Sequence, residues 1–378
     1  MTGMTTYRDY INESLNYHFC LNRKPINITT RMEHTRYRSD KPNLTAEQQD
    51  QITAAAQILR QGGTVAFPTE TVYGLGADVT NPVAINKIYT TKQRPVNHPL
   101  IVHIGDISHL HYWAQAIPDS AWELANHFWP GPLTLILQRS RHIPDSVTGG
   151  QDTVGLRIPA HPVALALLEA LGPEKALAAP SANRFGRISP TTAAHVREEL
   201  GSTVDMILDG GACRIGLEST IISFHDRSPK ILRPGGIALS ALELVLDSPI
   251  MLAHSTSQTI RTSGSLPAHY APTTPLRIYS TEQIWDRALA LAEQGLRILA
   301  ITWSSINQSQ PSDQFIQQFS MPADPVTYGQ QLYAKLRQFD QASFDYMIIE
   351  APPDHPSWFA IIDRLQRASY NPFNNNQN

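Results

Sequence analysis

Five segments of the chain combine hydroxyl, acidic or basic side chains with glycine or proline next to short apolar runs. The first, residues 67–76, reads Phe-Pro-Thr-Glu-Thr-Val-Tyr-Gly-Leu-Gly and is predicted as a strand that feeds a loop. Glycines let a ligand approach the backbone, and the hydroxyls of Thr69 and Thr71 can bind amino-acid or phosphate oxygens. The alternative is an ordinary strand-to-turn connection, and the pattern leaves both interpretations open.

A basic pair ends a predicted helix just before a buried strand. Lys92 and Arg94 stand two residues apart and are followed by Pro95, a spacing suited to clamping a polyphosphate. The alternative is a solvated basic helix end that is favoured by the helix dipole. His98 and His103 flank the start of the strand, where a lone histidine such as His103 is usually a core residue with satisfied hydrogen bonds.

Arg157 stands between two apolar neighbours, Leu156 and Ile158, in a predicted strand. An arginine is unusual there unless one face of the strand is wet or the side chain meets a buried anion. Exposure at a sheet edge is the alternative, and the two interpretations carry equal weight.

Two later segments repeat the pairing of hydroxyls with arginines at strand ends. Ser181, Asn183 and Ser189 follow one strand, at the edge where open α/β sheets place ligands. Ser219 precedes another strand, and Arg233 precedes Pro-Gly. Singly, such residues are also ordinary turn and cap formers. Together they suit a phosphate-rich ligand whose chemistry needs positioning and charge neutralisation.

The sequence contains none of the common nucleotide-binding or hydrolase signatures. No Walker A motif, no Gly-x-Gly-x-x-Gly and no Gly-x-Ser-x-Gly occurs. The spacing of histidine and cysteine predicts no zinc site, and no acidic metal cage is evident. Cys20 and Cys213 cannot form a disulfide framework, so we expect a reducing, cytoplasmic location.

The composition indicates a globular chain of two or three domains. Its 378 residues include 30 Lys and Arg against 33 Asp and Glu, a net charge of −3. A near-neutral net charge argues against an extensive basic surface that binds nucleic acid, although residues 1–45 hold seven basic and four acidic side chains. No apolar stretch of ~20 residues and no signal-peptide core occurs, so we expect no membrane partner.

Hydrophobic periodicity divides the chain into five parts. Residues 1–44 have no sustained period and are predicted as an N-terminal extension. Residues 45–246 mix helices with short apolar strands, which predicts an α/β domain. Residues 247–274, rich in Ser, Thr, Pro and Gly, are predicted as a linker. Residues 275–370 alternate strand and helix as in a small doubly wound, Rossmann-like domain, and 371–378 form a polar tail.

Together, the five segments resemble the threonylcarbamoyl-AMP synthase family, whose core is the YrdC-like domain. The resemblance covers about residues 56–236 and includes Lys-x-Arg-Pro, Pro-Leu-Ile-Val-His, Pro-Ser-Ala-Asn and Glu-Ser-Thr-Ile in that order after the first segment. Ala-His-Tyr-Ala-Pro at 268–272 and the domain at 276–368 are similar to the long form of the enzyme. The resemblance implies a twisted mixed sheet with a concave ligand cavity, followed by the small C-terminal domain.

The resemblance also implies a reaction and its binding residues. L-threonine, bicarbonate and ATP would give threonylcarbamoyl-AMP, pyrophosphate and water, a nucleotidyltransferase step that feeds threonylcarbamoyladenosine formation in tRNA. The implied threonine pocket consists of Thr71, His103, Arg157, the backbone of Ala179, and Ser219. The implied ATP contacts are Lys92, Arg94, His98, Thr153, Ser181, Asn183, Ser189, Arg233 and Tyr270, with Tyr270 folding over the nucleotide as part of a lid.

By the same resemblance, threonine carbamate attacks the α-phosphorus of ATP, and pyrophosphate leaves with its charge met by Lys92, Arg94, Arg233 and Mg²⁺. Lys92 and Arg94 are therefore the expected catalytic residues, and Mg²⁺ is expected to arrive with ATP rather than at a protein metal site. No general base is evident, and Glu70 is a candidate polar orienter. The expected macromolecular partners are a downstream threonylcarbamoyl transferase and, weakly, RNA or tRNA.

Other interpretations stay open beside this one. An RNA-binding module would use the concave surface of a YrdC-like domain, with phosphates bound by Lys92, Arg94, Arg184, Arg187 and Arg233. Against it, only Phe185 stands near these cations to stack a base. Carbamoyl transfer as in hydrogenase maturation is disfavoured because the zinc-finger cysteines and the acylphosphatase segment of those proteins are missing. Residues 1–44 are either an upstream start, with Met32 as the alternative initiator, or a basic arm that contacts tRNA.

Overall fold

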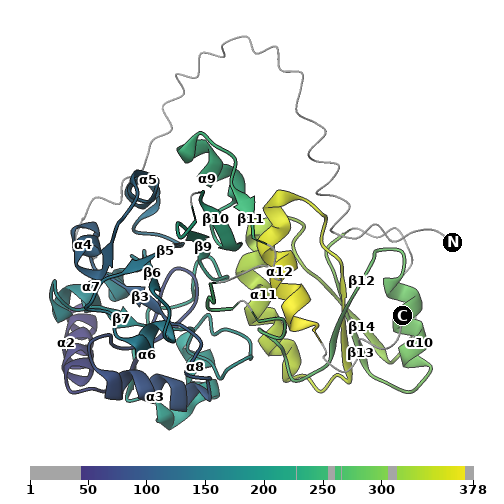
Figure 1. Ribbon diagram of the computed structural model, residues 1–378. Helices are drawn as coiled ribbons and strands as arrows, with labels where there is room; N and C mark the ends of the chain where they lie inside the picture. Colours follow the sequence, from purple (N-terminus) through teal and green to yellow (C-terminus); the bar gives the residue numbers. More distant parts are fainter. Residues whose placement is uncertain (1–43, 227, 254–259, 265, 305–312, 371–378) are drawn as a thin grey trace, which may run out of the picture. The chain divides into compact units, whose positions relative to one another are not determined.

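The structure, a computed structural model, describes residues 44–226, 228–253, 260–264, 266–304 and 313–370 (Figure 1). The predicted extension 1–44, apart from Leu44, and the predicted tail 371–378 lie outside these described residues. Within the described ranges, no helix has both the length and the apolar character that crossing a membrane requires.

The helices of the first domain begin at residues that cap them. Helix α2 (Ala46–Arg60) starts at a reciprocal pair in which Thr45 Oγ1 accepts from Gln48 N and Gln48 Oε1 accepts from Thr45 N. Helix α3 (Pro82–Lys92) starts after Asn81, with proline at its first position. The others are α4 (Leu110–Trp113), α5 (Asp119–Phe128), α6 (Asp145–Thr148), α7 (Pro162–Leu171), α8 (Ala193–Leu200) and α9 (Leu239–Leu246).

These helices pack on a mixed sheet whose order is β11-β10-β9-β5-β6-β3-β7-β2-β1-β8, with β4 paired to β5. Its strands are β1 (Val65–Phe67), β2 (Gly74–Asp78), β3 (Ile101–His103), β4 (Ala114–Gln115), β5 (Leu133–Arg139), β6 (Thr153–Arg157), β7 (Leu177–Ala178), β8 (Met206–Ile207), β9 (Thr220–Ser223), β10 (Lys230–Arg233) and β11 (Met251–Leu252). Strand β3 runs parallel to β6 and antiparallel to β7, and this register places His103 opposite Arg157. The predicted mixed α/β sheet is confirmed.

The second domain is a parallel four-stranded sheet in the order β12-β15-β13-β14. Its elements are β12 (Leu276–Tyr279), α10 (Ile284–Ala292), β13 (Ile298–Thr302), β14 (Ile316–Ser320), α11 (Pro325–Asp340), β15 (Tyr346–Glu350) and α12 (Phe359–Ala368). Helix α10 covers one face, and α11 and α12 cover the other (Figure 1). Successive side chains of β13 therefore point to opposite faces of the sheet. Ile298 packs with apolar residues of α10, and Leu299 packs with apolar residues of α11 and α12.

Two details differ from the sequence expectations. The expected loop after Phe67 contains strand β2, which was missed because glycine is a poor strand former. Packing explains the glycine, since a Cβ on Gly76 would lie 2.8 Å from Phe67 Cε1. Within the predicted linker 247–274, Met251–Leu252 forms β11 and pairs with β10, so the first sheet extends into this segment.

Candidate active site

A cavity lies where β3 and β6 end. Every residue that the family resemblance assigned to threonine lines it, namely Thr71, His103, Arg157, Ala179 and Ser219. Of the residues assigned to ATP, Ser181, Arg233 and Tyr270 line it. The remaining lining includes Thr69, Glu218, Ser263 and His269. The fold therefore brings together, in one cavity, residues that are as far as about 200 positions apart in the sequence.

Arg157 is held at one wall of the cavity by three acceptors. Its Nη2 lies 2.7 Å from Glu70 Oε1 and donates to Thr71 Oγ1 at 3.0 Å, and its Nε donates to Gly131 O at 3.1 Å. Glu70 is itself fixed, because its Oε2 accepts from Ala160 N at 2.9 Å. A buried arginine with a carboxylate behind it presents a fixed guanidinium edge, the group that best grips a second carboxylate.

His103 lies beside this guanidinium as a neutral imidazole. Burial, together with the nearby Arg157, lowers the pKa of His103 to about 3. Its ring meets Phe67 edge-on at 5.9 Å between centroids, and its Nδ1 has no hydrogen-bond partner among the described residues. The imidazole therefore offers the cavity an uncharged polar edge.

Ser219 and Arg233 form another wall of the cavity. Ser219 Oγ lies 2.7 Å from Thr134 Oγ1, and Arg233 Nη2 donates to Ser219 O at 2.8 Å. Arg233 Nη1 donates to Ser263 O at 2.8 Å, which ties the wall to the segment before the second domain. Gly235 allows this packing, because a Cβ there would lie 2.4 Å from Glu218 O. Arg233 is only 2% exposed, so any anion that its guanidinium meets must enter the cavity.

Lys92 and Arg94 are buried next to the cavity and support its loops. Lys92 Nζ donates to Ser181 O at 2.5 Å and also to Asn183 O. Arg94 Nη2 donates to Pro99 O at 2.9 Å, and its guanidinium lies 5.5 Å from the centroid of the Phe185 ring. Burial lowers the pKa of Lys92 well below its usual range and that of Arg94 to about 10. Neither cation lies on an open surface of the kind that the RNA-binding hypothesis requires.

The remaining residues assigned to ATP are more scattered. Asn183 Nδ2 donates to Arg184 O and Arg187 O, so this side chain closes a turn. Its Oδ1 is buried without a hydrogen-bond partner among the described residues. Thr153 lines a second, smaller cavity, and His98 lies 5.3 Å from the Phe185 ring.

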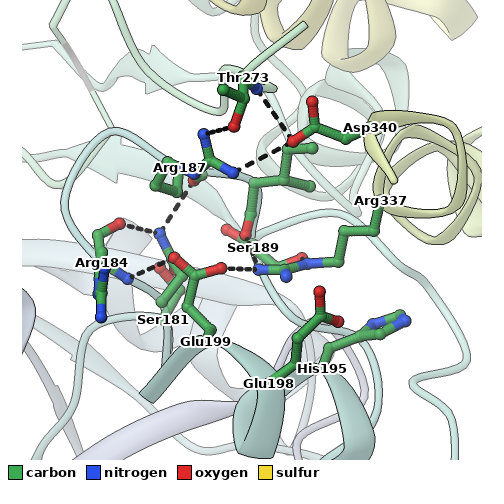
Figure 2. Close-up of polar contacts among 12 residues, drawn as sticks. Ser181, Arg184, Arg187, Ser189, His195, Glu198, Glu199, Thr273, Arg337 and Asp340 are labelled. Atoms are coloured by element: carbon green, nitrogen blue, oxygen red, sulfur yellow. Dashed lines mark hydrogen bonds and ion pairs between the residues drawn. The ribbon is translucent and has the colours of Figure 1, made fainter. Parts of the chain in front are cut away.

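Helix α11 of the second domain holds the loop that carries Ser189 (Figure 2). Arg187 Nη2 donates to Asp340 Oδ2 at 3.1 Å. Arg337 Nη2 donates to Ile188 O and, at 3.1 Å, to Glu199 Oε2. Arg337 is 6% exposed, so this contact is part of the packed interior rather than a surface ion pair.

Tyr270 fills the side of the cavity that faces α11 and α12. Its ring stacks on Tyr333 at 5.7 Å between centroids, and Arg364 lies 5.1 Å above it. The backbone of Tyr270 has a φ of 61°, a conformation that costs a non-glycine residue energy and clusters at functional sites. Its hydroxyl is buried without a hydrogen-bond partner among the described residues.

Glu218 joins the two domains at the cavity. Ser189 Oγ donates to its Oε1 at 2.6 Å, while Arg364 Nε and Tyr333 Oη donate to its Oε2 at 2.8 and 2.9 Å. Burial alone would raise the pKa of Glu218, but Arg364 and Arg233 with the Ser189 hydrogen bond outweigh it and lower the pKa to about 2. The carboxylate is therefore charged at every ordinary pH.

Comparison with known proteins agrees with this geometry. A family model described as "Telomere recombination" matches residues 57–235, and one described as "Threonylcarbamoyl-AMP synthase, C-terminal domain" matches residues 237–369. A threonylcarbamoyl-AMP synthase from Bacillus subtilis (strain 168) is 41% identical over 325 residues, which is 84% of this chain and 93% of that protein. The chain belongs to the threonylcarbamoyl-AMP synthase family.

Other members of the threonylcarbamoyl-AMP synthase family are similar over the same length. The Pyrococcus abyssi synthase is 37% identical, covering 84% of this chain and 94% of that protein. A crystal structure of P. abyssi Sua5 complexed with L-threonine matches with a TM-score of 0.76 and 36% identity, over 85% of this chain and 94% of that one. The predicted family and fold class are both confirmed.

Sequence reasoning about this family member missed the contribution of the second domain to the cavity. Arg364 and Tyr333 carry no motif, and they reach Glu218 from more than 100 positions away. One signal was present in the sequence: Arg364 lies within the apolar stripe of α12, between Ile361 and Leu365, all of them buried. A charged residue in such a stripe indicates a buried partner.

Proposed function

We propose that the chain is an L-threonylcarbamoyladenylate synthase, an enzyme that converts L-threonine, bicarbonate and ATP into threonylcarbamoyl-AMP, pyrophosphate and water for tRNA modification. The observation that carries the proposal is the single cavity lined by all five residues assigned to threonine. The P. abyssi Sua5 structure, which has the same fold, is a complex with L-threonine. The reaction class is nucleotidyl transfer.

The threonine end of the cavity is formed by Arg157 and its neighbours. The guanidinium would grip the threonine carboxylate, because Glu70 and Thr71 already fix its orientation. Neutral His103 and the hydroxyl of Ser219 supply polar contacts without adding charge. Fixed donors of this kind lower the entropy cost of aligning the nucleophile.

The phosphate end is formed by Arg233, with Lys92 and Arg94 behind the loops. Threonine carbamate would attack the α-phosphorus, and the phosphorus–oxygen bond to pyrophosphate would break in line. The cations would offset the growing charge on pyrophosphate. Lys92 must exchange its carbonyl contacts, or share them, to reach a phosphate oxygen.

Mg²⁺ would enter this cavity as part of the MgATP substrate. Among the described residues, no group of three or more His, Cys, Asp or Glu side chains is arranged to hold a metal ion. The carboxylates nearest the cavity, Glu70 and Glu218, are both engaged by arginines. The phosphates and water are therefore the proposed ligands of Mg²⁺, as is common for this cation. Bicarbonate, a downstream transferase, weak RNA binding and a cytoplasmic location stay predictions.

A turnover assay with radiolabelled bicarbonate tests the proposal. Label should enter an adenylate only when threonine and ATP are both present. Arg157→Ala should raise the KM for threonine more than about tenfold while the affinity for ATP stays within about twofold. ATP–pyrophosphate exchange that is independent of threonine and bicarbonate would overturn the proposed reaction. Equal losses of threonine and ATP affinity in Arg157→Ala would overturn the assignment of the pocket.

A further inference from the structure

The second domain places a positive charge directly against a carboxylate of the active-site cavity. Arg364 on α12 is 1% exposed, and its Nε donates to Glu218 Oε2 at 2.8 Å. Glu218 lines the cavity next to Ser219, and Arg233 packs against the same segment. Glu218 is thus an acidic group inside a site proposed to bind a triphosphate.

A carboxylate at this position would oppose ATP unless it is neutralised. Like charges brought together in a buried site are strongly unfavourable, and a buried charge that loses its partner is more costly still. Hydrogen bonds from Ser189 and Tyr333 orient Glu218 but bring no positive charge. Arg233 is the other cation that acts on it, and that guanidinium is already directed at Ser219 O and Ser263 O.

We propose that Arg364 is a positioning residue of the synthase, which neutralises Glu218 so that this carboxylate supports the loops of Ser189 and Ser219 without repelling ATP. The inference rests on the proposed function and assigns a role in it to the second domain. Arg364 acts through Glu218, so it need not touch any substrate. The orientation of Arg364 is itself fixed, because its Nη1 donates to Asp363 Oδ2 at 2.5 Å.

The titratable groups around Glu218 determine how the pKa of its carboxyl changes when Arg364 is replaced. They are Arg364 and Asp363 on α12, Tyr333 on α11, Arg233 on β10, and His269 and Tyr270 before the second domain. Burial keeps His269 neutral and the two tyrosines protonated, since it lowers the pKa of the first and raises those of the others. Burial raises the pKa of Glu218, and without Arg364 the main group that lowers this pKa is Arg233. The pKa of the Glu218 carboxyl therefore rises when Arg364 is replaced.

The test compares Arg364→Met with the double variant Arg364→Met/Glu218→Gln in the full chain. Arg364→Met should raise the KM for ATP about tenfold at pH near 8 and leave the KM for threonine within about twofold. The effect should shrink as the pH falls, because protonation of Glu218 removes the repulsion. The double variant should return the KM for ATP to within about threefold of the wild type, with no dependence on pH. Arg364→Lys, which keeps the charge, should lie near the wild type.

Arg337→Met is the matched control, because Arg337 is also a buried arginine of the second domain but contacts Ile188 and Glu199 instead of Glu218. Simple loosening of the domain contact would give both single variants the same, pH-independent response, and that result would overturn the inference. A double variant no better than Arg364→Met would also overturn it. If Arg364→Met fails to fold, the inference is still tested by the double variant and by Arg364→Lys, which should both have a KM for ATP near that of the wild type. A wild-type chain without threonine-dependent turnover would instead overturn the proposed function.

Discussion

Arg157 Nη2 lies 2.7 Å from Glu70 Oε1, and the two side chains are 5% and 2% exposed. The arginine assigned to the threonine carboxylate is therefore already paired with a carboxylate of the protein. A guanidinium has five N–H donors, and the contacts with Gly131, Thr71 and Glu70 use those of Nε and Nη2, which leaves Nη1 to face a ligand. The pair sets the direction in which Arg157 can grip threonine.

Glu70→Gln should weaken threonine binding through the orientation of Arg157. We expect the KM for threonine to rise about tenfold and the free energy of unfolding to fall by about 1–3 kcal/mol, because a buried charge loses its partner. Steady-state kinetics and urea unfolding measure the two effects. Asp145→Asn is the control: this carboxylate pairs with Arg139 but is 77% exposed, so we expect less than about 1 kcal/mol. An unchanged threonine KM in Glu70→Gln would exclude the orienting role.

His103 should make the protein less stable in acid. Its pKa is about 3 in the folded chain and about 6.5 when unfolded, so the unfolded state binds the additional proton between these values. Stability from this residue is complete above about pH 6.5 and falls by about 1.4 kcal/mol per pH unit toward pH 3. The free energy of unfolding, measured by urea at intervals from about pH 7 to pH 5, should therefore fall less steeply with decreasing pH for His103→Gln than for the wild type. The same slope in both proteins, with His111→Gln as the surface control, would contradict the burial of His103.

Gly235→Ala should damage the wall formed by Ser219 and Arg233. The new methyl group would lie 2.4 Å from Glu218 O and from the backbone of Ser219, so the strand must move. We expect a loss of about 1–3 kcal/mol in stability and higher KM values for both threonine and ATP. Gly105→Ala is the matched control, since its methyl group would meet Leu168 Cβ at an ordinary 3.4 Å. Equal behaviour of the two variants in thermal unfolding and turnover would contradict the contact.

Two tyrosines that stack on each other should respond differently to loss of their hydroxyls. Tyr333→Phe removes a hydrogen bond to the Glu218 carboxylate and should cost about 1.5–3 kcal/mol. Tyr270→Phe removes a buried hydroxyl that has no partner among the described residues, so stability should stay equal or increase by up to about 1 kcal/mol. If Tyr270 contacts the nucleotide, its variant should raise the KM for ATP severalfold. A large loss of stability in Tyr270→Phe would show instead that its hydroxyl is bonded in the folded protein.

Elements with clear local signals were predicted well from the sequence. The helix that was predicted to end at the basic pair before Pro95 is α3, which the structure places at Pro82–Lys92. The alternation of strand and helix predicted for residues 275–370 is confirmed, and Leu276–Tyr279 and Tyr346–Glu350 are two of its parallel strands. Strand β2 was missed because its glycines are explained only by the approach of Phe67, a tertiary contact.

The candidate site also contains residues that the sequence predicts and contacts that only the tertiary structure shows. Residues in motifs, such as Arg157 and Ser219, were identified because the order of the motifs is specific to the family, and the cavity gathers them. The pairing of Glu218 with Arg364 could not be predicted, since it joins residues 146 positions apart across two domains. Nothing local distinguishes a buried arginine that stabilises a helix face from one that compensates a carboxylate in a cavity.

The shared carboxylate of Glu218 has a consequence for how the chain unfolds. If either domain lost its structure alone, the ion pair between Arg364 and Glu218 would be broken. The apolar cluster that contains Leu217 and Tyr270 also contains Tyr328 and Leu332 of α11, which adds to the coupling. We therefore expect the two sheets to unfold together, and we expect a ligand bound in the cavity to stabilise both.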